Sequence, residues 1–171
     1  MGTGSGIGNY GSGQRCPAQE CRKDGKHKHR IFIGHGRSKA WKQLRRFIRS
    51  LGLVPDEFNE DPVAELRTKE RLRAMLDNAC FAFLVMTADD QHVDGTHHAR
   101  ENVIREAGLF QERLGFQRAI ILLEQGCAEF SNIEGIQQIR FPRGNTLATA
   151  VEIHGVLERE GIPTRGGENR A

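Results

Sequence analysis

The chain has 171 residues, of which 37% are hydrophobic and 27% are charged, a composition typical of a soluble protein with one globular domain. No apolar run approaches the roughly 18 residues that a membrane-spanning helix needs, and no apolar signal-peptide core opens the sequence, so we expect a cytoplasmic protein with no membrane partner. The four cysteines are too few and too scattered for a disulfide scaffold.

The formal net charge of +3 lies mainly at the N-terminus. Residues 1–30 hold six basic and two acidic residues, which leaves the rest of the chain at a charge of about −1. A second group of basic residues follows the first predicted strand. Its spacing is that of the solvated side of an amphipathic helix, so we expect no nucleic-acid partner. This group consists of Lys39, Lys42, Arg45, Arg46 and Arg49.

Residues 1–29 are rich in Gly and Ser and then basic, with few apolar side chains to bury, so we predict a disordered tail. Gly6, Gly8 and Gly11 fit the pattern G-x-G-x-x-G, but the strand and helix that surround this pattern in dinucleotide-binding folds are missing. The Cys and His residues of the tail have the spacing C-x4-C-x5-H-x-H, which differs from that of zinc fingers, and we expect no metal site. They are Cys16, Cys21, His27 and His29.

Strand and helix patterns alternate from Arg30 onward. Residues 31–33 form a short apolar run that predicts a strand, and Gly34-His35-Gly36 ends it. Ser38 is the expected N-cap of a helix that ends at Gly52. One side of this helix is apolar, and we interpret its Trp as a core residue rather than a platform for stacking adenine. The apolar side consists of Trp41, Leu44, Ile48 and Leu51.

A short strand at Leu53-Val54, a polar loop over 56–60 and a second helix come next. The helix is predicted to begin at Asp61-Pro62, because proline fits the first turn of a helix, and to run to Asn78. Its apolar periodicity is clear only in the second half. The residues that carry it are Leu72, Met75, Leu76 and Ala79.

The run from Cys80 to Met86 is apolar throughout, which predicts the central strand of a sheet with helices on both faces. Cys80 and Cys127 are expected to be small buried hydrophobic side chains. The following loop, 87–98, is polar, and we interpret its acidic residues and histidines as surface groups rather than metal ligands. They are Asp89, Asp90, His92, Asp94, His97 and His98.

A helix over residues 99–114 carries the strongest functional signal of the chain. Its apolar residues recur at steps of three and four and predict one buried face. Asn102 and Glu106 stand one turn apart beside that face. A carboxylate at the edge of a buried stripe lies where a cleft forms, so Glu106 is our candidate catalytic residue, and an ordinary solvated glutamate is the alternative. The apolar face consists of Val103, Ala107, Phe110 and Leu114.

The remaining elements are two strands and a closing helix. Residues 119–123 predict another buried strand, and residues 138–141 predict a weaker edge strand. A helix over 146–160 completes the domain, which we place at 30–162, and residues 163–171 are predicted to be a flexible tail. The apolar residues of the closing helix are Leu147, Ala150, Val151 and Leu157.

Strands separated by helices predict an α/β fold, with a roughly five-stranded parallel sheet, helices on both faces and the three layers of a flavodoxin-like architecture. In such sheets ligands bind beyond the carboxyl ends of the strands. That rule directs attention to residues 34–37, to residues 87–90 and to the first half of the helix that carries Glu106.

The same segments carry a family resemblance. Residues 30–36, 84–90 and 99–110, followed by Leu114-Gly115, resemble the bacterial TIR-like nucleotide-binding family. Its members include the TIR effector domains of cyclic-nucleotide anti-phage systems, of the TIR-STING and Pycsar types. The likeness extends from Arg30 to Ile162. Its most specific part is the element Arg-x-Asn-Val-Ile-x-Glu-x-Gly.

The resemblance implies a TIR fold that cleaves the nicotinamide–ribose bond of NAD⁺ when it assembles. The catalytic glutamate of the family falls on Glu106. Arg100 and Asn102 would position the substrate or hold the Glu106 carboxylate, although a local hydrogen bond is an equal alternative for Asn102. The residues that would border the substrate are Gly34, His35, Gly36, Arg37, Asp89 and Asp90.

Two positions depart from the family pattern. Ala107 stands where the family commonly has Leu, directly after the candidate glutamate. The charged stretch 61–66 stands where the family usually has a Gly-rich turn. The second departure bears on loop contacts and assembly rather than on the glutamate.

We therefore predict an NAD⁺ or NADP⁺ nucleosidase that needs no cofactor or metal, since NAD⁺ is its substrate. Its expected partners are other copies of the chain, through TIR–TIR contacts, and a separate sensor protein, because neither tail has the apolar content of a sensor domain. A non-catalytic module that binds nucleotide or partner TIR surfaces is the alternative. A phospho-receiver domain fits less well, because Gly34-His35-Gly36 occupies the place of its acidic pair.

Overall fold

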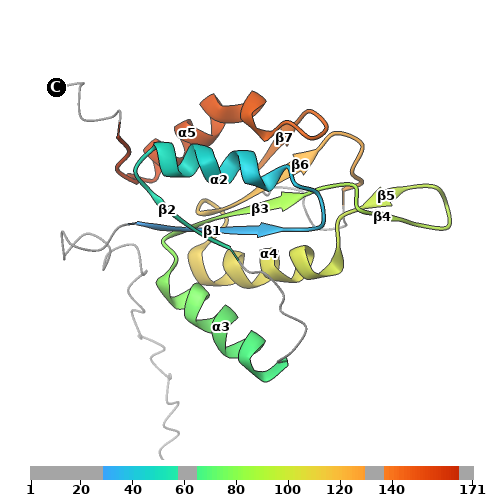
Figure 1. Ribbon diagram of the computed structural model, residues 1–171, viewed down its shortest axis with the longest axis horizontal. Coiled ribbons are helices and arrows are strands. Elements are labelled where there is room, and N and C mark those ends of the chain that lie inside the picture. Colours follow the sequence, from blue (N-terminus) through green and yellow to red (C-terminus); the bar gives the residue numbers. More distant parts are fainter. Residues whose placement is uncertain (1–28, 58–64, 130–136, 166–171) are drawn as a thin grey trace, which may run out of the picture.

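The computed structural model describes residues 29–57, 65–129 and 137–165 (Figure 1). Residues 1–28, with their glycine and Cys/His patterns, the predicted helix start at Asp61-Pro62 and residues 166–171 lie outside this part. The elements are β1 (Arg30–His35), α2 (Trp41–Ser50), β2 (Val54–Glu57), α3 (Glu65–Asn78), β3 (Phe81–Met86), β4 (Asp90–Gln91), β5 (His97–His98), α4 (Glu101–Leu114), β6 (Ala119–Glu124), β7 (Gln138–Phe141), η1 (Thr146–Thr149) and α5 (Ala150–Arg159).

The main sheet is parallel, with five strands in the order β2-β1-β3-β6-β7. The apolar strand β3 lies at its centre, as the run from Cys80 to Met86 predicts, and β7 is an edge strand, as predicted for residues 138–141. Helices α2 and α5 cover one face, and α3 and α4 cover the other (Figure 1). The predicted three-layer α/β fold is confirmed.

Alternation of side chains along the strands divides the core into two. Ile33 of β1 belongs to the core under α2 and α5. Phe32 points to the other face, where its ring stacks on Phe110 of α4 with centroids 4.0 Å apart. The predicted apolar face of α4 is buried, including Ala107, which is 1% exposed. Burial of each large apolar side chain contributes about 1.5–3 kcal/mol, so this face fixes how α4 lies on the sheet.

Two local predictions near the start of the domain are wrong. Ser38 does not cap α2, because the N-cap is Ala40; the Ser38 hydroxyl instead accepts the Ala40 N–H at 3.3 Å and shapes the turn before the helix. Strand β2 extends through Glu57, although residues 56–60 read as a polar loop. An edge strand needs only backbone pairing along one side, here with β1, so half-buried polar side chains and Pro55 are compatible with it.

Two further departures lie later in the chain. The predicted loop 87–98 contains a small antiparallel hairpin, β4–β5, which projects from the body in Figure 1. The closing helix begins with the 3-10 turn η1, so its buried face shifts: Leu147 and Val151 are 45% and 84% exposed. A 3-10 turn has 3.0 residues per turn rather than 3.6, which changes the phase of the stripe. The buried residues of α5 are Ile153, Val156 and Leu157.

The last described residues, 162–165, pack on the domain. Thr164 is buried, and the Arg165 N–H donates to the Leu51 carbonyl at 2.8 Å. Among the helices of the described segments, none combines the length and the apolar character needed to cross a membrane.

Candidate functional site

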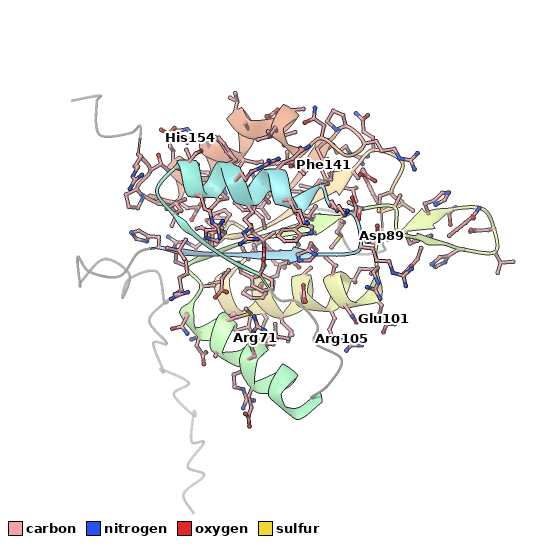
Figure 2. The ribbon with its side chains drawn as sticks, viewed as in Figure 1. Arg71, Asp89, Glu101, Arg105, Phe141 and His154 are labelled. Carbon is pink, nitrogen blue, oxygen red and sulfur yellow. The ribbon has the colours of Figure 1, made fainter. Side chains whose placement is uncertain are left out.

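The carboxyl ends of the central strands gather the segments that the sequence singles out. Gly34 and His35 of β1 pair with Leu84 and Val85 of β3, so the loops after these strands begin side by side. The first half of α4 reaches the same edge: Figure 2 shows Asp89 and Glu101 at the end of the domain toward which the strands point. The predicted convergence of residues 34–37, 87–90 and the helix of Glu106 is therefore present.

Glu106 lies directly over the end of β1. A Cβ atom added at Gly34 would lie 2.7 Å from Glu106 Oε2 and 2.7 Å from Leu84 Cδ1. Gly34 is buried, and only the absence of a side chain lets the carboxylate approach so closely. Burial of Val103, Ala107 and the rest of the α4 stripe sets the rotation of the helix, and this rotation turns half-buried Glu106 toward the sheet edge.

Asp89 holds the loop after β1. Its Oδ2 atom accepts the Arg37 N–H at 2.8 Å, and a Cβ atom added at Gly36 would clash with the same oxygen. The stem of Arg100 covers this turn as well, with Cγ 3.5 Å from the added Cβ atom. Gly36, Arg37, Asp89 and Arg100 thus form one contiguous patch, in which glycine is required because the carboxylate occupies the space of a side chain.

Charged groups remain available around this patch. The guanidinium groups of Arg37 and Arg100 form no ion pair with any described residue. Arg100 is the N-cap residue of α4, whose first turn also holds half-buried Asn102. Asp90 is half-buried and opens the β4–β5 hairpin opposite His98. The carboxyl edge of the sheet therefore carries both carboxylates and guanidinium groups that form no ion pair with a described residue.

The His35 side chain lies apart from Glu106. Its ring stacks on Trp41 of α2 with centroids 4.1 Å apart, on the face of the sheet opposite to Gly34 and α4. The Nδ1 atom donates to the Gly36 carbonyl at 2.9 Å, because a carbonyl can only accept. Burial lowers the pKa of His35, so the ring is neutral near pH 7 and serves packing. Trp41 is 7% exposed and is a core residue, as predicted.

Glu124 is a residue at this edge that sequence reasoning missed. It ends β6, is only 5% exposed, and its two carboxylate oxygens accept the Ala88 and Gly144 N–H groups at 3.3 and 3.0 Å. A sequence signal existed: an acidic residue directly after the buried run 119–123 falls at the ligand-bearing end of a parallel strand. Our strand prediction stopped at Leu123 and left the next residue out.

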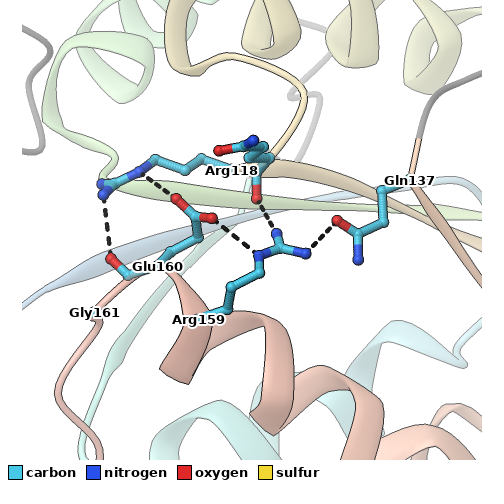
Figure 3. Close-up of a pocket in the computed structure, with 6 residues that line it drawn as sticks. Arg118, Gln137, Arg159, Glu160 and Gly161 are labelled. Atoms are coloured by element: carbon cyan, nitrogen blue, oxygen red, sulfur yellow. Dashed lines mark hydrogen bonds and ion pairs between the residues drawn. The ribbon is translucent and has the colours of Figure 1, made fainter.

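A pocket of about 570 Å³ lies at the opposite, amino edge of the sheet (Figure 3). Its polar groups bond one another: Arg118 Nε and Arg159 Nε donate to the two oxygens of Glu160 at 3.1 and 3.0 Å, and Arg159 also donates to Gln137 and to the Gln117 carbonyl. The two cations also lie at the carboxyl end of α5, where they offset the negative end of the helix dipole. We interpret these hydrogen bonds as structural, because they connect α5 to the loops before β6 and β7.

In the described ranges, no group of three or more His, Cys, Asp and Glu side chains could hold a metal ion. Two histidines of the hairpin segment, His92 and His98, stack on one another, with their ring centroids 3.8 Å apart. Cys80 and Cys127 are buried, as predicted. Cys16, Cys21 and His27 lie outside the described residues.

The parallel sheet, its strand order and a helix that brings a glutamate to the carboxyl edge define an α/β domain of the TIR-like, flavodoxin-like class. Residues 30–143 match the family described as the TIR domain of CAP12/Pycsar effector proteins, and the chain belongs to this family. The resemblance inferred from the sequence motifs is thereby confirmed.

Two curated proteins are similar to this chain. CD-NTase-associated protein 12 of Flavobacterium daejeonense is 31% identical over 142 residues, which cover 77% of this chain and 44% of the relative. The protein YuaY of Escherichia coli K12, which is uncharacterized, is 28% identical over 137 residues, covering 77% of this chain and 42% of the relative. The chain thus spans less than half the length of either relative.

Proposed function

We propose that this chain is a nucleosidase that cleaves the nicotinamide–ribose bond of NAD⁺ or NADP⁺. The observation that carries the proposal is the Glu106 carboxylate, held against Gly34 at the carboxyl edge of the sheet in a domain of the TIR effector family. Parallel α/β sheets bind their ligands at this edge. In the pocket at the amino edge, the charged side chains bond one another, so this pocket supports no catalytic role.

The chemistry requires one carboxylate and no acid partner. Nicotinamide leaves a cationic nucleotide as a neutral molecule, so its departure needs no proton, and the barrier lies in the oxocarbenium-like ribose. A negative charge beside that ribose stabilises the transition state by several kcal/mol in a dry site. Glu106 acts in this way or as a transient nucleophile at the ribose carbon. The products are nicotinamide and ADP-ribose, after addition of water, or a cyclised form of ADP-ribose.

The neighbouring residues then bind the rest of the dinucleotide. Arg37 and Arg100 belong to the patch, have no ion-pair partners among the described residues and are suited to the pyrophosphate. Asn102 and Asp90 are suited to the ribose hydroxyls. Asp89 contributes indirectly, because its carboxylate is already bonded to the Arg37 N–H and shapes the loop.

We further propose that the chain is an effector in bacterial anti-phage defence. The similarity to a relative named CD-NTase-associated protein 12 supports the idea that this chain responds to a signalling partner of the CD-NTase type. A separate sensor protein would pass the signal of that partner to this chain. Assembly of several copies through TIR–TIR contacts would then switch on cleavage.

The test is release of nicotinamide by the purified chain, measured by chromatography with NAD⁺ alone, under crowding and after forced oligomerisation. Glu106→Gln is expected to slow release by about 100- to 1,000-fold, the range seen when one preorganised group that stabilises a transition state, such as an oxyanion-hole donor, is removed. Glu112→Ala is the matched control, since Glu112 is an exposed glutamate on the same helix. The proposal fails if the assembled wild type never releases nicotinamide, or if the Glu106 variant releases it equally fast.

A further inference from the structure

Glu124 is a buried carboxylate at the same edge of the sheet as the candidate site. It is 5% exposed, and each of its oxygens accepts a backbone N–H, from Ala88 at 3.3 Å and from Gly144 at 3.0 Å. A buried carboxylate is costly unless such donors satisfy it. Ala88 follows β3 and Gly144 follows β7, so this one side chain connects two loops that are far apart in the sequence.

The first of these loops holds the beginning of the β1–α2 segment. Asp89, next to Ala88, accepts the Arg37 N–H at 2.8 Å and lies against Gly36. The Asp89 N–H in turn donates to the Thr87 carbonyl at 2.8 Å, which keeps the turn compact. The position of the Asp89 carboxylate therefore depends on where the Ala88 backbone is anchored.

The second loop holds the other end of the same segment. Gln43 of α2 donates to the Gly144 carbonyl at 3.2 Å and accepts the Thr146 N–H at 3.1 Å. The Thr146 hydroxyl, which is fully buried, donates to the Ala40 carbonyl at 3.1 Å. Residues 36–43 are thus held by Asp89 at one end and by the loop after β7 at the other.

We infer that Glu124 is a positioning residue, which closes a ring of hydrogen bonds around residues 36–43 and thereby fixes Gly36 and Arg37 for substrate binding. This inference rests on the proposed function, because it assigns Glu124 a part in the same site. Glu124 does not touch the substrate. It acts through Ala88 and Asp89 on one side of the ring and through Gly144 on the other.

The test is Glu124→Gln, in which the amide keeps one acceptor oxygen but turns an NH₂ group toward the second backbone N–H. One anchor of the ring is then lost. We expect KM for NAD⁺ to rise about tenfold with a smaller change in kcat, because binding groups rather than Glu106 are displaced. The exchange of the Arg37 amide hydrogen, followed by NMR or mass spectrometry, should accelerate by a similar factor.

Glu160→Gln is the matched control, because Glu160 is a half-buried carboxylate that bonds two partners at the opposite edge of the sheet. It should lower Tm without altering KM or the exchange of the Arg37 amide. Thr146→Val is a second variant that removes a different bond of the ring and leaves Glu124 intact. It should raise KM and speed Arg37 exchange in the same direction, and it carries the test if Glu124→Gln does not fold.

The inference is overturned if the ring variants change KM and Arg37 exchange no more than Glu160→Gln does at equal loss of Tm. Arg37 exchange needs no catalysis. If the wild-type chain never releases nicotinamide, the proposed function fails, while faster Arg37 exchange in Glu124→Gln still supports the ring. Unchanged exchange in a chain that does cleave NAD⁺ would refute the ring alone.

Discussion

Gly34→Ala is the substitution that most directly tests the placement of Glu106. The added methyl group would lie 2.7 Å from Glu106 Oε2 and 2.7 Å from Leu84 Cδ1. Each of these atoms must retreat by about 0.7 Å to reach an ordinary van der Waals contact of 3.4 Å. Leu84 is completely buried in the central strand, so the yielding partner is the carboxylate.

The cost is expected in both stability and catalysis. Overpacking of this kind destabilises a domain by about 1–3 kcal/mol, which lowers Tm by several degrees in a protein of this size. Displacing a reacting group by somewhat less than 1 Å lowers kcat/KM by about 10- to 100-fold. The loss should appear mainly in kcat, because the carboxylate rather than the binding loop is moved.

Nicotinamide release and thermal unfolding of the same preparations provide the assay. Gly108→Ala is the matched control: a Cβ atom there meets nothing within 4 Å, and alanine favours the helix by about 0.5–1 kcal/mol over glycine. It should raise Tm and leave kcat unchanged. Wild-type kcat in Gly34→Ala, at the expected loss of Tm, would refute the reasoning that close approach to β1 positions Glu106 for catalysis.

Three further predictions concern the rest of the domain. Burial lowers the pKa of His35 from its ordinary value of 6.5. Below about pH 6.5 the unfolded chain therefore binds a proton at this ring that the native protein does not bind, which favours unfolding. The neutral ring thus adds its full stability to the native state above about pH 6.5, and this stability is lost as the pH falls toward the lowered pKa. His35→Phe, which can still stack on Trp41, should therefore lose less Tm than wild type between about pH 7.5 and 5, and an equal loss would contradict this account. Burial raises the pKa of Cys127 to about 11, so iodoacetamide at pH 8 should alkylate it only after denaturation, as peptide mass spectrometry would reveal. Ile153→Ala should cost about 2–5 kcal/mol in urea unfolding, whereas Val151→Ala should stay within about 0.5 kcal/mol; the reverse order would mean that α5 packs in the predicted phase rather than the observed one.

The fold could be predicted where burial dictates the sequence pattern. Strand β3 is buried on both faces, so every residue of it is apolar, and α4 shows its buried stripe because one face packs on the sheet. Strand β2 escaped full prediction because an edge strand is specified by backbone pairing rather than by apolar side chains. The phase of the closing helix was missed because a 3-10 turn cannot be distinguished from an α-helical turn by composition.

The site could be predicted to the level of the backbone but not of every side chain. The topology rule brings residues 34–37 to the ligand edge, yet consecutive residues of a strand point to opposite faces. Gly34 therefore faces α4 and Glu106, while His35 faces Trp41 and the other core. A contiguous motif such as Gly34-His35-Gly36 cannot line a single cavity with all of its side chains. Its two glycines leave space for the carboxylates of Glu106 and Asp89. Its histidine packs on Trp41 on the opposite face of the sheet.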